Sequence, residues 1–262
     1  RFVSLAKDLT DSRRSLEYAN KLRLARSVQQ RMYPGAPPWG SGFDVAGAAI
    51  PADETGGDYY DFLRLPDGGL TLAVGDVSGH GFEAALYMVE VRAALRTLTR
   101  SNPDPGSVLT ALNEFLADEF AENRFVTLVL ANLDPRIRTL RYASAGHTTG
   151  FLMDASGNLK AELCSTGVPL GLFAGTSFTS ATTPPLEEGD LVALVTDGIT
   201  EAVRDDVDFG AAGVLDLLRR YQHESAARIA DHMCRAVIGF SGGPQNDDIT
   251  TVICKVTGQA LA

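Results

Sequence analysis

Aspartates stand at the ends of several apolar segments that have the pattern of β-strands, and their carboxylates could do chemistry together. These residues are Asp58, Asp76, Asp197, Asp247 and Asp248. A carboxylate at the end of an apolar strand is costly unless something compensates its charge. If several strand ends converge, the simplest compensation is a metal ion. Carboxylates, backbone carbonyls and water suit hard cations, so the pattern indicates Mg²⁺ or Mn²⁺.

A second interpretation of each aspartate is a turn or a helix cap, since aspartate favours both. Asp197, for example, could cap a short helix that follows it. Small or turn-forming residues also stand beside these sites, namely Gly57, Gly75, Gly198 and Asn246. One isolated Asp-Gly pair fits the capping interpretation well, but four such sites together weaken it. The order and spacing of the motifs must therefore decide between the two.

Cysteine is scarce in this chain, which excludes two other kinds of site. Cys164, Cys234 and Cys254 are odd in number and far apart, and no CxxC pair is present. Neither a disulfide framework nor a structural zinc site fits this usage. A reducing cytosol is the simplest setting, so we expect a cytoplasmic protein.

The charge balance bears on the choice of partner. The chain has 262 residues, with 23 Lys and Arg against 33 Asp and Glu, so its net charge is 23 − 33 = −10. Nucleic acid and anionic membranes are polyanions, and an acidic chain is a poor partner for both. No apolar run reaches about 18 residues, so no transmembrane helix is expected. We therefore predict a partner other than nucleic acid.

Runs of strands alternate with pairs of helices along most of the chain. Strands are predicted at 43–50, 59–65, 70–77, 125–133, 138–144, 149–153, 158–163, 191–196 and 249–256. Helices are predicted at 81–100, 106–121, 210–220 and 223–238. Strands and helices do not alternate one by one, as a parallel βαβ array requires. The pattern favours an α+β fold, a four-layer α-β-β-α sandwich with two mainly antiparallel sheets.

Residues 1–31 differ from the rest, because they hold no Gly or Pro and have apolar residues near a heptad spacing. This predicts one long amphipathic helix with a stutter, which ends near Pro34. The helix either packs on its own domain or forms a coiled linker that pairs with a second copy or joins an upstream sensor domain. We assign 1–31 as a linker or dimerisation helix and 32–262 as the main domain.

Five short motifs carry a resemblance to a known family. In chain order they are GGDYYDF at 56–62, GDVSGHG at 75–81, SAGH at 144–147, TDGITEA at 196–202 and NDDIT at 246–250. Together they resemble the bacterial SpoIIE/RsbU branch of the metal-dependent protein Ser/Thr phosphatases, the PPM or type-2C family. The resemblance covers roughly residues 25–256. The family fold, a central β-sandwich flanked by helices, agrees with the predicted layers.

The resemblance implies which residues bind two Mn²⁺ or Mg²⁺ ions. Asp76 would bridge them, Asp58 and the Val77 carbonyl would join one ion, and Asp197 and Asp247 would hold the other. By the same resemblance Asp248 and Gly57 would support these ligands. The implied reaction is attack of a metal-activated water on phosphoserine or phosphothreonine, with no side-chain nucleophile.

Two departures from the wider family concern the substrate phosphate and the proton donor. The wider family has a phosphate-binding Arg near the first motif, but no Arg lies in 51–55. Metals, backbone amides or a distant Arg would have to take its role. The wider family also has a His two residues after the bridging Asp, where this chain has Ser78. The nearest histidine, His80, is either the proton donor or a loop residue.

Two other motif patterns, those of dinucleotide-binding proteins and of GxSxG hydrolases, fit this sequence poorly. The segment 79–84 matches GxGxxA, but the second parallel strand of a dinucleotide-binding unit is missing. The glycine spacing around Ser78 is not that of a GxSxG hydrolase. A catalytically silent, phosphatase-shaped binding module is the main alternative. The resemblance implies a phosphoprotein substrate, such as an anti-sigma-factor antagonist in a partner-switching stress response.

Overall fold

Two antiparallel sheets form the centre of the molecule. The computed structural model describes residues 2–35, 42–65, 68–119, 124–243 and 245–258. The first sheet has the strand order β1-β12-β9-β6-β7. Its strands are β1 (Phe43–Ile50), β6 (Gly150–Met153), β7 (Leu159–Leu163), β9 (Leu191–Val195) and β12 (Ile249–Val256). The first and last strands of the main domain are therefore neighbours, and Ile50 pairs with Ile249.

The second sheet has the strand order β2-β3-β4-β5-β8. Its strands are β2 (Tyr59–Arg64), β3 (Leu70–Val77), β4 (Val126–Asp134), β5 (Thr139–Ala145) and β8 (Ala181–Thr182). Consecutive strands β2 to β5 form an antiparallel meander. A separate small hairpin pairs β10 (Val203–Arg204) with β11 (Val207–Asp208).

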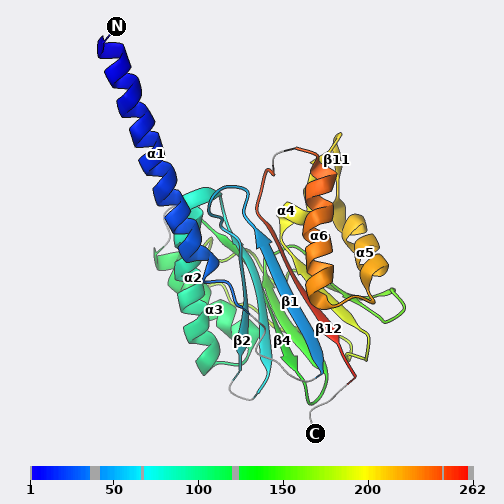
Figure 1. The fold of residues 1–262 in the computed structure, drawn as a ribbon. Coiled ribbons are helices and arrows are strands. Elements are labelled where there is room, and N and C mark those ends of the chain that lie inside the picture. Colours follow the sequence, from blue (N-terminus) through cyan, green and yellow to red (C-terminus); the bar gives the residue numbers. More distant parts are fainter. Residues whose placement is uncertain (1, 36–41, 66–67, 120–123, 244, 259–262) are drawn as a thin grey trace.

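Helices cover the outer face of each sheet (Figure 1). The second sheet packs against α2 (Gly81–Ser101) and α3 (Pro105–Glu119), and the first against α5 (Gly210–Tyr221) and α6 (Ala226–Ser241). The short helix α4 (Asp197–Thr200) follows β9 directly. The long helix α1 (Phe2–Gln30) projects from one end of the body, and only its C-terminal end approaches the sheets.

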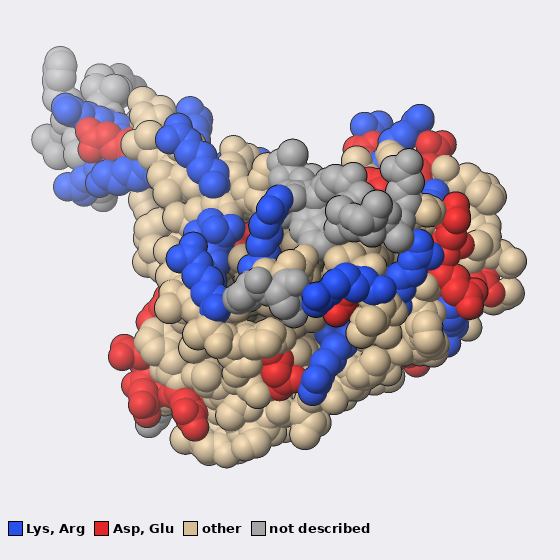
Figure 2. Space-filling view, turned by 90° about the horizontal axis from the view of Figure 1, so that it is seen from below, with Lys and Arg blue, Asp and Glu red and all other residues tan. Residues whose placement is uncertain are grey.

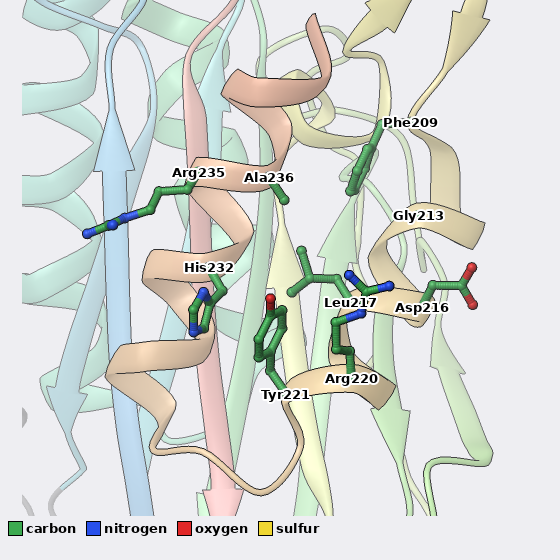
Figure 3. Close-up of a pocket in the computed structure, with 9 residues that line it drawn as sticks. All are labelled: Phe209, Gly213, Asp216, Leu217, Arg220, Tyr221, His232, Arg235 and Ala236. Atoms are coloured by element: carbon green, nitrogen blue, oxygen red, sulfur yellow. The ribbon is translucent and has the colours of Figure 1, made fainter.

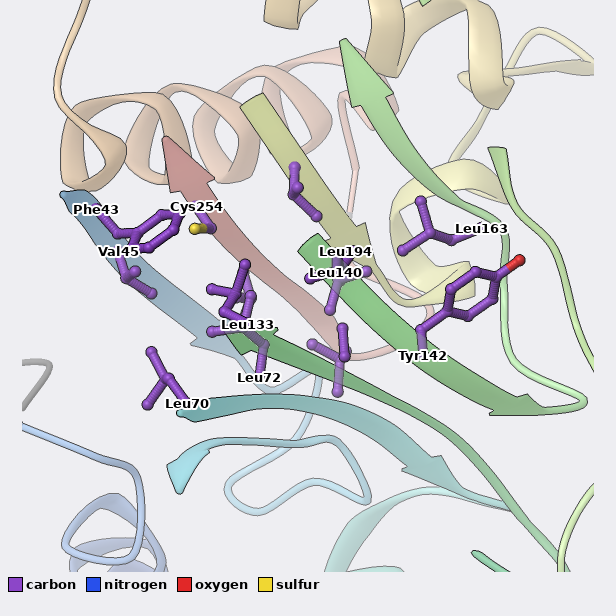
Figure 4. Close-up of a cluster of buried hydrophobic side chains, with 14 of the residues drawn as sticks. Phe43, Val45, Leu70, Leu72, Leu133, Leu140, Tyr142, Leu163, Leu194 and Cys254 are labelled. Atoms are coloured by element: carbon purple, nitrogen blue, oxygen red, sulfur yellow. The ribbon is translucent and has the colours of Figure 1, made fainter. Parts of the chain in front are cut away.

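Alternation along the strands explains why the layers pack in this order. In β3, Leu70, Leu72 and Val74 face the other sheet, whereas Ala73 and Val77 face α2 and α3. This is the two-residue period of a strand that is buried on both faces. The side chains that face one another between the sheets form a closed apolar core (Figure 4). The predicted four-layer α+β sandwich is confirmed.

Most element bounds agree with the prediction, and the differences have local causes. The predicted helix at 223–238 begins at Ala226, because Ser225 is its N-cap and its Oγ accepts a hydrogen bond from the Arg228 amide at 3.4 Å. The two-residue strands β8, β10 and β11 were not predicted, because so short a segment has no period. The end of the predicted helix at 106–121 lies outside the described residues. The division into 1–31 and 32–262 stays a prediction.

The surface carries several features away from the strand ends where the aspartates lie. Lys and Arg side chains cross the opposite end of the molecule (Figure 2). Between α5 and α6 lies an open cavity of about 440 Å³, where Tyr221 stacks on His232 at 3.9 Å between ring centroids (Figure 3). No predicted site residue lines this cavity. Among the described residues, no helix has the length and apolar character needed to cross a membrane.

Candidate metal centre

The predicted acidic residues lie at one edge of the sandwich, where strands of both sheets end. Asp76 lies next to the last residue of β3, Asp197 follows β9, and Asp248 precedes β12. Asp58 lies directly before β2, in the loop that leads from β1. Because Tyr59 pairs with Gly75 and Val195 with Thr251, the register brings these positions to a common end of each sheet.

Thr196 joins the two sheets at Asp58. Its hydroxyl donates to Asp58 Oδ2 at 2.9 Å, and Thr196 Oγ1 itself accepts from the Thr250 amide at 3.0 Å. Asp58 is 2% exposed, so this bond fixes a buried carboxylate. Thr196 therefore sets the orientation of Asp58 from the opposite sheet.

Asp248 holds the loop that carries Asp58. Its Oδ1 accepts from the Ala52 amide at 2.8 Å, and its Oδ2 accepts from the Asp58 amide at 3.3 Å. Asp248 is buried, and both of its oxygens are taken up by backbone N–H groups. The supporting role of Asp248 stays a prediction, and this geometry agrees with it.

Glycines allow the backbones to approach closely at this edge. A Cβ on Gly57 would lie 2.7 Å from the Val77 carbonyl oxygen and 3.2 Å from Asp76 Oδ1. A Cβ on Gly56 would collide with the Asp248 carboxylate, and one on Gly198 with the Asp248 carbonyl. A side chain at any of the three would push the acidic residues apart, which explains glycine at these positions.

The carboxylates act on one another electrostatically. Burial and the charges of Asp197, Asp247 and Asp248 raise the pKa of Asp76 to about 8. Burial and the neighbouring Asp76 and Asp248 raise the pKa of Asp58 well above its usual range. The pKa of Asp197 is raised by burial, Asp247 and Glu201. Such mutual repulsion is what a bound cation would relieve.

Asp197 and Asp247 are the more open members of the group. Asp197 Oδ1 accepts from the Gly198 amide at 3.0 Å, at the start of α4. Asp247 is exposed, and its Oδ1 accepts from the Asp248 amide at 2.8 Å. Capping and metal binding are compatible here, because each of the two carboxylates has a second oxygen to which no described residue donates a hydrogen bond.

The donor set fits hard divalent cations. It consists of carboxylates and the Val77 carbonyl, and glycine at 57 lets the backbone lie close to that carbonyl and Asp76. Within the described residues, no three or more His, Cys, Asp or Glu side chains are gathered closely enough to hold a metal ion as they stand.

His80 lies beside the site but does not contact its carboxylates in any described interaction. Its side chain is 71% exposed, and its Nδ1 is 3.0 Å from Asp53 Oδ2. It stands at the N-cap of α2 without a capping bond from its side chain. His147, by contrast, is buried against Thr127, and burial lowers its pKa to about 4. It remains neutral near pH 7.

Arg124 lies on the other side of the loop that follows Asp76. It donates to the Ser78 carbonyl at 2.7 Å and pairs with Glu83 at 2.8 Å. Because no Arg lies in 51–55, a distant arginine was one predicted alternative for binding the substrate phosphate, and Arg124 is a candidate of this kind. In this structure its bonds serve the loop.

A family model matches most of this chain. The model of Stage II sporulation protein E (SpoIIE) matches residues 66–257. The chain belongs to the SpoIIE family.

Known relatives of this SpoIIE-family chain agree with that assignment. Phosphoserine phosphatase RsbU of Bacillus subtilis is 26% identical over 91% of this chain and 71% of its own length. The SiaA-PP2C domain of Pseudomonas aeruginosa superposes with a TM-score of 0.78 at 23% identity, over 93% of this chain and 98% of that domain. RsbX in complex with magnesium has a TM-score of 0.61 at 17% identity, over 84% of this chain and 98% of RsbX. The predicted SpoIIE/RsbU-like branch and the enzyme class, protein Ser/Thr phosphatases, are confirmed.

Several residues of the SpoIIE-family site have no signal in the sequence. Gln245 Nε2 donates to the carbonyls of Ile50 at 2.8 Å and Asp247 at 2.6 Å, and so fixes the loop before β12. Gln29 and Tyr33 bond to the backbone around Asp58 from the end of α1. Thr196 was part of a motif but had no predicted role. Each of these contacts joins segments that are distant in sequence or depends on a backbone conformation.

The metal-free SpoIIE-family domain is expected to lose stability as the pH rises from about 5 to about 8. The folded pKa of Asp76, about 8, lies above its ordinary value of 3.8, so the folded state keeps a proton that the unfolded chain releases. The stabilisation is complete below the ordinary pKa and is lost as the pH rises through the folded one. The measurement is the melting temperature in EDTA at about pH 5 and about pH 8. The fall in melting temperature between the two should be smaller in Asp76→Asn than in the wild type.

A matched control is Glu187→Gln, which changes a carboxylate that is 80% exposed and lies 3.9 Å from Lys160. It should leave the pH dependence as in the wild type. Equal pH dependence of wild type and Asp76→Asn would contradict the assignment of this effect to Asp76.

Proposed function

We propose that this domain hydrolyses phosphoserine or phosphothreonine on a regulatory phosphoprotein, with Mn²⁺ or Mg²⁺ held by its aspartates. The observation that carries the proposal is the convergence of Asp58, Asp76 and Asp197 at one edge of both sheets, with pKa values raised by burial and by neighbouring carboxylates. PP2C-type phosphatases as a family depend on metal, and the neighbour RsbX was solved with magnesium. Two ions are proposed here.

Each ligand has a definite place in this proposal. Asp76, at the end of β3, would bridge the ions, and Asp58 with the Val77 carbonyl would hold one of them. Asp197 and Asp247 would hold the other, while Asp248 and Gly57 keep the Asp58 loop in place. When bound, the cations supply a water activated for direct attack on phosphorus and offset the charge of the phosphoryl group.

The protein's own residues orient the site and exclude alternative positions of its ligands. Thr196 holds Asp58 Oδ2, so the other carboxylate oxygen is left for a cation. Val77 N donates to the Gly57 carbonyl at 3.4 Å, which ties the loop of Asp58 to the end of β3. His80 remains the candidate proton donor, and its Nδ1 lies 3.0 Å from Asp53 Oδ2.

We also propose a substrate, a sensor domain, a location and an oligomeric state for this domain. A small phosphoprotein, such as an anti-sigma-factor antagonist in a partner-switching stress pathway, is the proposed substrate, because RsbU is a curated relative. An upstream sensor domain and a cytoplasmic location are proposed with it. A homodimer through residues 1–31 is supported by exposed apolar side chains on the projecting helix, such as Leu16 and Leu24.

The test is hydrolysis of p-nitrophenyl phosphate and of a phosphoserine peptide with EDTA, Mg²⁺ or Mn²⁺. We expect activity with Mn²⁺ or Mg²⁺ and none with EDTA, because the acidic site has no other electrophile. Calorimetric titration should show that Mn²⁺ binds at the same Mn²⁺ concentrations that activate hydrolysis. Metal binding without turnover of either substrate would instead favour the alternative, a catalytically silent binding module.

A further inference from the structure

The last turn of α1 is bonded to the loop that carries Asp58. Among the described side chains of α1, only Gln29 is buried, at 5% exposure. Its Nε2 donates to the Gly56 carbonyl at 2.6 Å, and its Oε1 accepts from the Gly56 amide at 3.2 Å. One side chain thus satisfies both backbone polar groups of a single residue, as a neighbouring strand would.

Two contacts next to Gln29 strengthen the attachment. Tyr33 donates its hydroxyl to the Asp58 carbonyl at 3.0 Å and stacks on Tyr60 with 5.2 Å between ring centroids. Arg92 of α2 donates to the Met32 carbonyl at 3.1 Å. The segment after α1 is therefore fixed both to the loop and to α2.

The Gly56 backbone is held from two directions. The Asp248 carboxylate lies where a Cβ of Gly56 would be, and Gln29 bonds to its peptide groups. The loop from Pro51 to Asp58 has no regular secondary structure, so its buried peptide groups need partners from elsewhere. The orientation of these peptides sets the direction of the Asp58 side chain two residues later.

Glutamine suits this position because of its chemistry. A carboxamide offers an NH2 group that donates and a carbonyl oxygen that accepts, and it carries no charge. A glutamate would lose the donor and add a negative charge near Asp58 and Asp248. A leucine of similar size would leave the Gly56 N–H and carbonyl buried without partners, which is costly.

We propose that Gln29, with Tyr33 beside it, is a positioning residue that orders the 52–58 loop and so aims Asp58 at the metal site. This inference rests on the proposed function for its metal readout. Gln29 does not touch substrate or metal and acts only through the Gly56 backbone. Its loss therefore weakens metal binding more than it weakens the fold.

The test compares Gln29→Leu and Gln29→Glu with Gln30→Leu, which changes the exposed next residue of the same helix. Hydrogen exchange of the metal-free protein and calorimetric Mn²⁺ titration are the readouts. We expect faster exchange at the amides of 52–58 and Mn²⁺ affinity about tenfold weaker in both Gln29 variants, which is about 1.4 kcal/mol. Exchange in β3 and β12 should stay as in the wild type, and Gln30→Leu should behave as the wild type.

Hydrolysis kinetics at varied Mn²⁺ concentration add a measurement that distinguishes a positioning role from a merely structural one. The Mn²⁺ concentration for half-maximal hydrolysis should rise about tenfold in Gln29→Leu, whereas kcat at saturating Mn²⁺ should recover to near the wild-type value. Unchanged loop exchange together with unchanged Mn²⁺ affinity would overturn the proposal. If Gln29→Leu does not fold, Gln29→Asn tests the same point, because its shorter amide keeps the polarity but not the reach.

The two proposals can fail separately. If the wild type binds no Mn²⁺ but loop exchange still rises in the Gln29 variants, the proposed function fails and the ordering of the loop by Gln29 stands. If the wild type binds Mn²⁺ and hydrolyses substrate while both Gln29 variants match it in loop exchange and affinity, only the role of Gln29 fails.

Discussion

Asp76→Asn is expected to lower metal-dependent hydrolysis by at least about 10³-fold while leaving the fold intact. Asp76 is the carboxylate on which the charges of Asp197, Asp247 and Asp248 converge, and it is the proposed bridge between the ions. An amide keeps the size of the side chain but removes the charge that would bind both cations. Single-turnover hydrolysis of a phosphoserine peptide and calorimetric Mn²⁺ titration measure the two losses.

The same variant should be at least as stable as the wild type in EDTA near pH 8. The wild-type carboxyl is destabilised there by burial and by like charges, and the amide has no charge to repel. Loss of activity with retained or increased melting temperature separates a ligand from a structural residue. Full activity of Asp76→Asn would refute the assignment, whereas Glu187→Gln should stay at the wild-type rate.

The sequence predicts those helices and strands in which apolar residues recur at a regular spacing or which end at a strong turn signal. The strands at 43–50, 70–77 and 249–256 have the predicted bounds, because apolar runs end at Pro, Gly or Asp. The pairing of β1 with β12 could not be read from the sequence, since nothing local in either strand specifies its neighbour. The two-residue strands have no pattern that a sequence could show.

The site was predictable in its charges and less so in its supports. Asp58, Asp76 and Asp197 stand in short motifs that mark strand ends, and the structure brings them to one edge. Thr196 and Gln29 reach across 138 and 27 residues of chain to their partners, and a polar residue in a helix or strand has many possible roles. Tertiary structure alone assigns them.

Arg96→Ala is expected to destabilise the domain by about 3 kcal/mol, the lower end of the range for breaking a buried ion pair. Arg96 on α2 donates to both carboxylate oxygens of Asp61, at 2.6 and 2.9 Å. Asp61 on β2 is fully buried, so the variant leaves its charge without a counter-ion. The lower end applies because Arg96 is 37% exposed and water can replace part of the guanidinium.

Thermal unfolding at constant pH and saturating Mn²⁺ measures this effect, and a loss of about 3 kcal/mol corresponds to a fall of roughly 6–12 °C for a domain of this size. Arg100→Ala, at an exposed position of the same helix, is the matched control and should change the melting temperature little. The double variant Arg96→Ala with Asp61→Asn should recover part of the loss, because it removes the uncompensated charge.

An Arg96→Ala domain as stable as the wild type would show that Tyr59, whose hydroxyl donates to Asp61 at 2.6 Å, is a sufficient partner for the buried carboxylate.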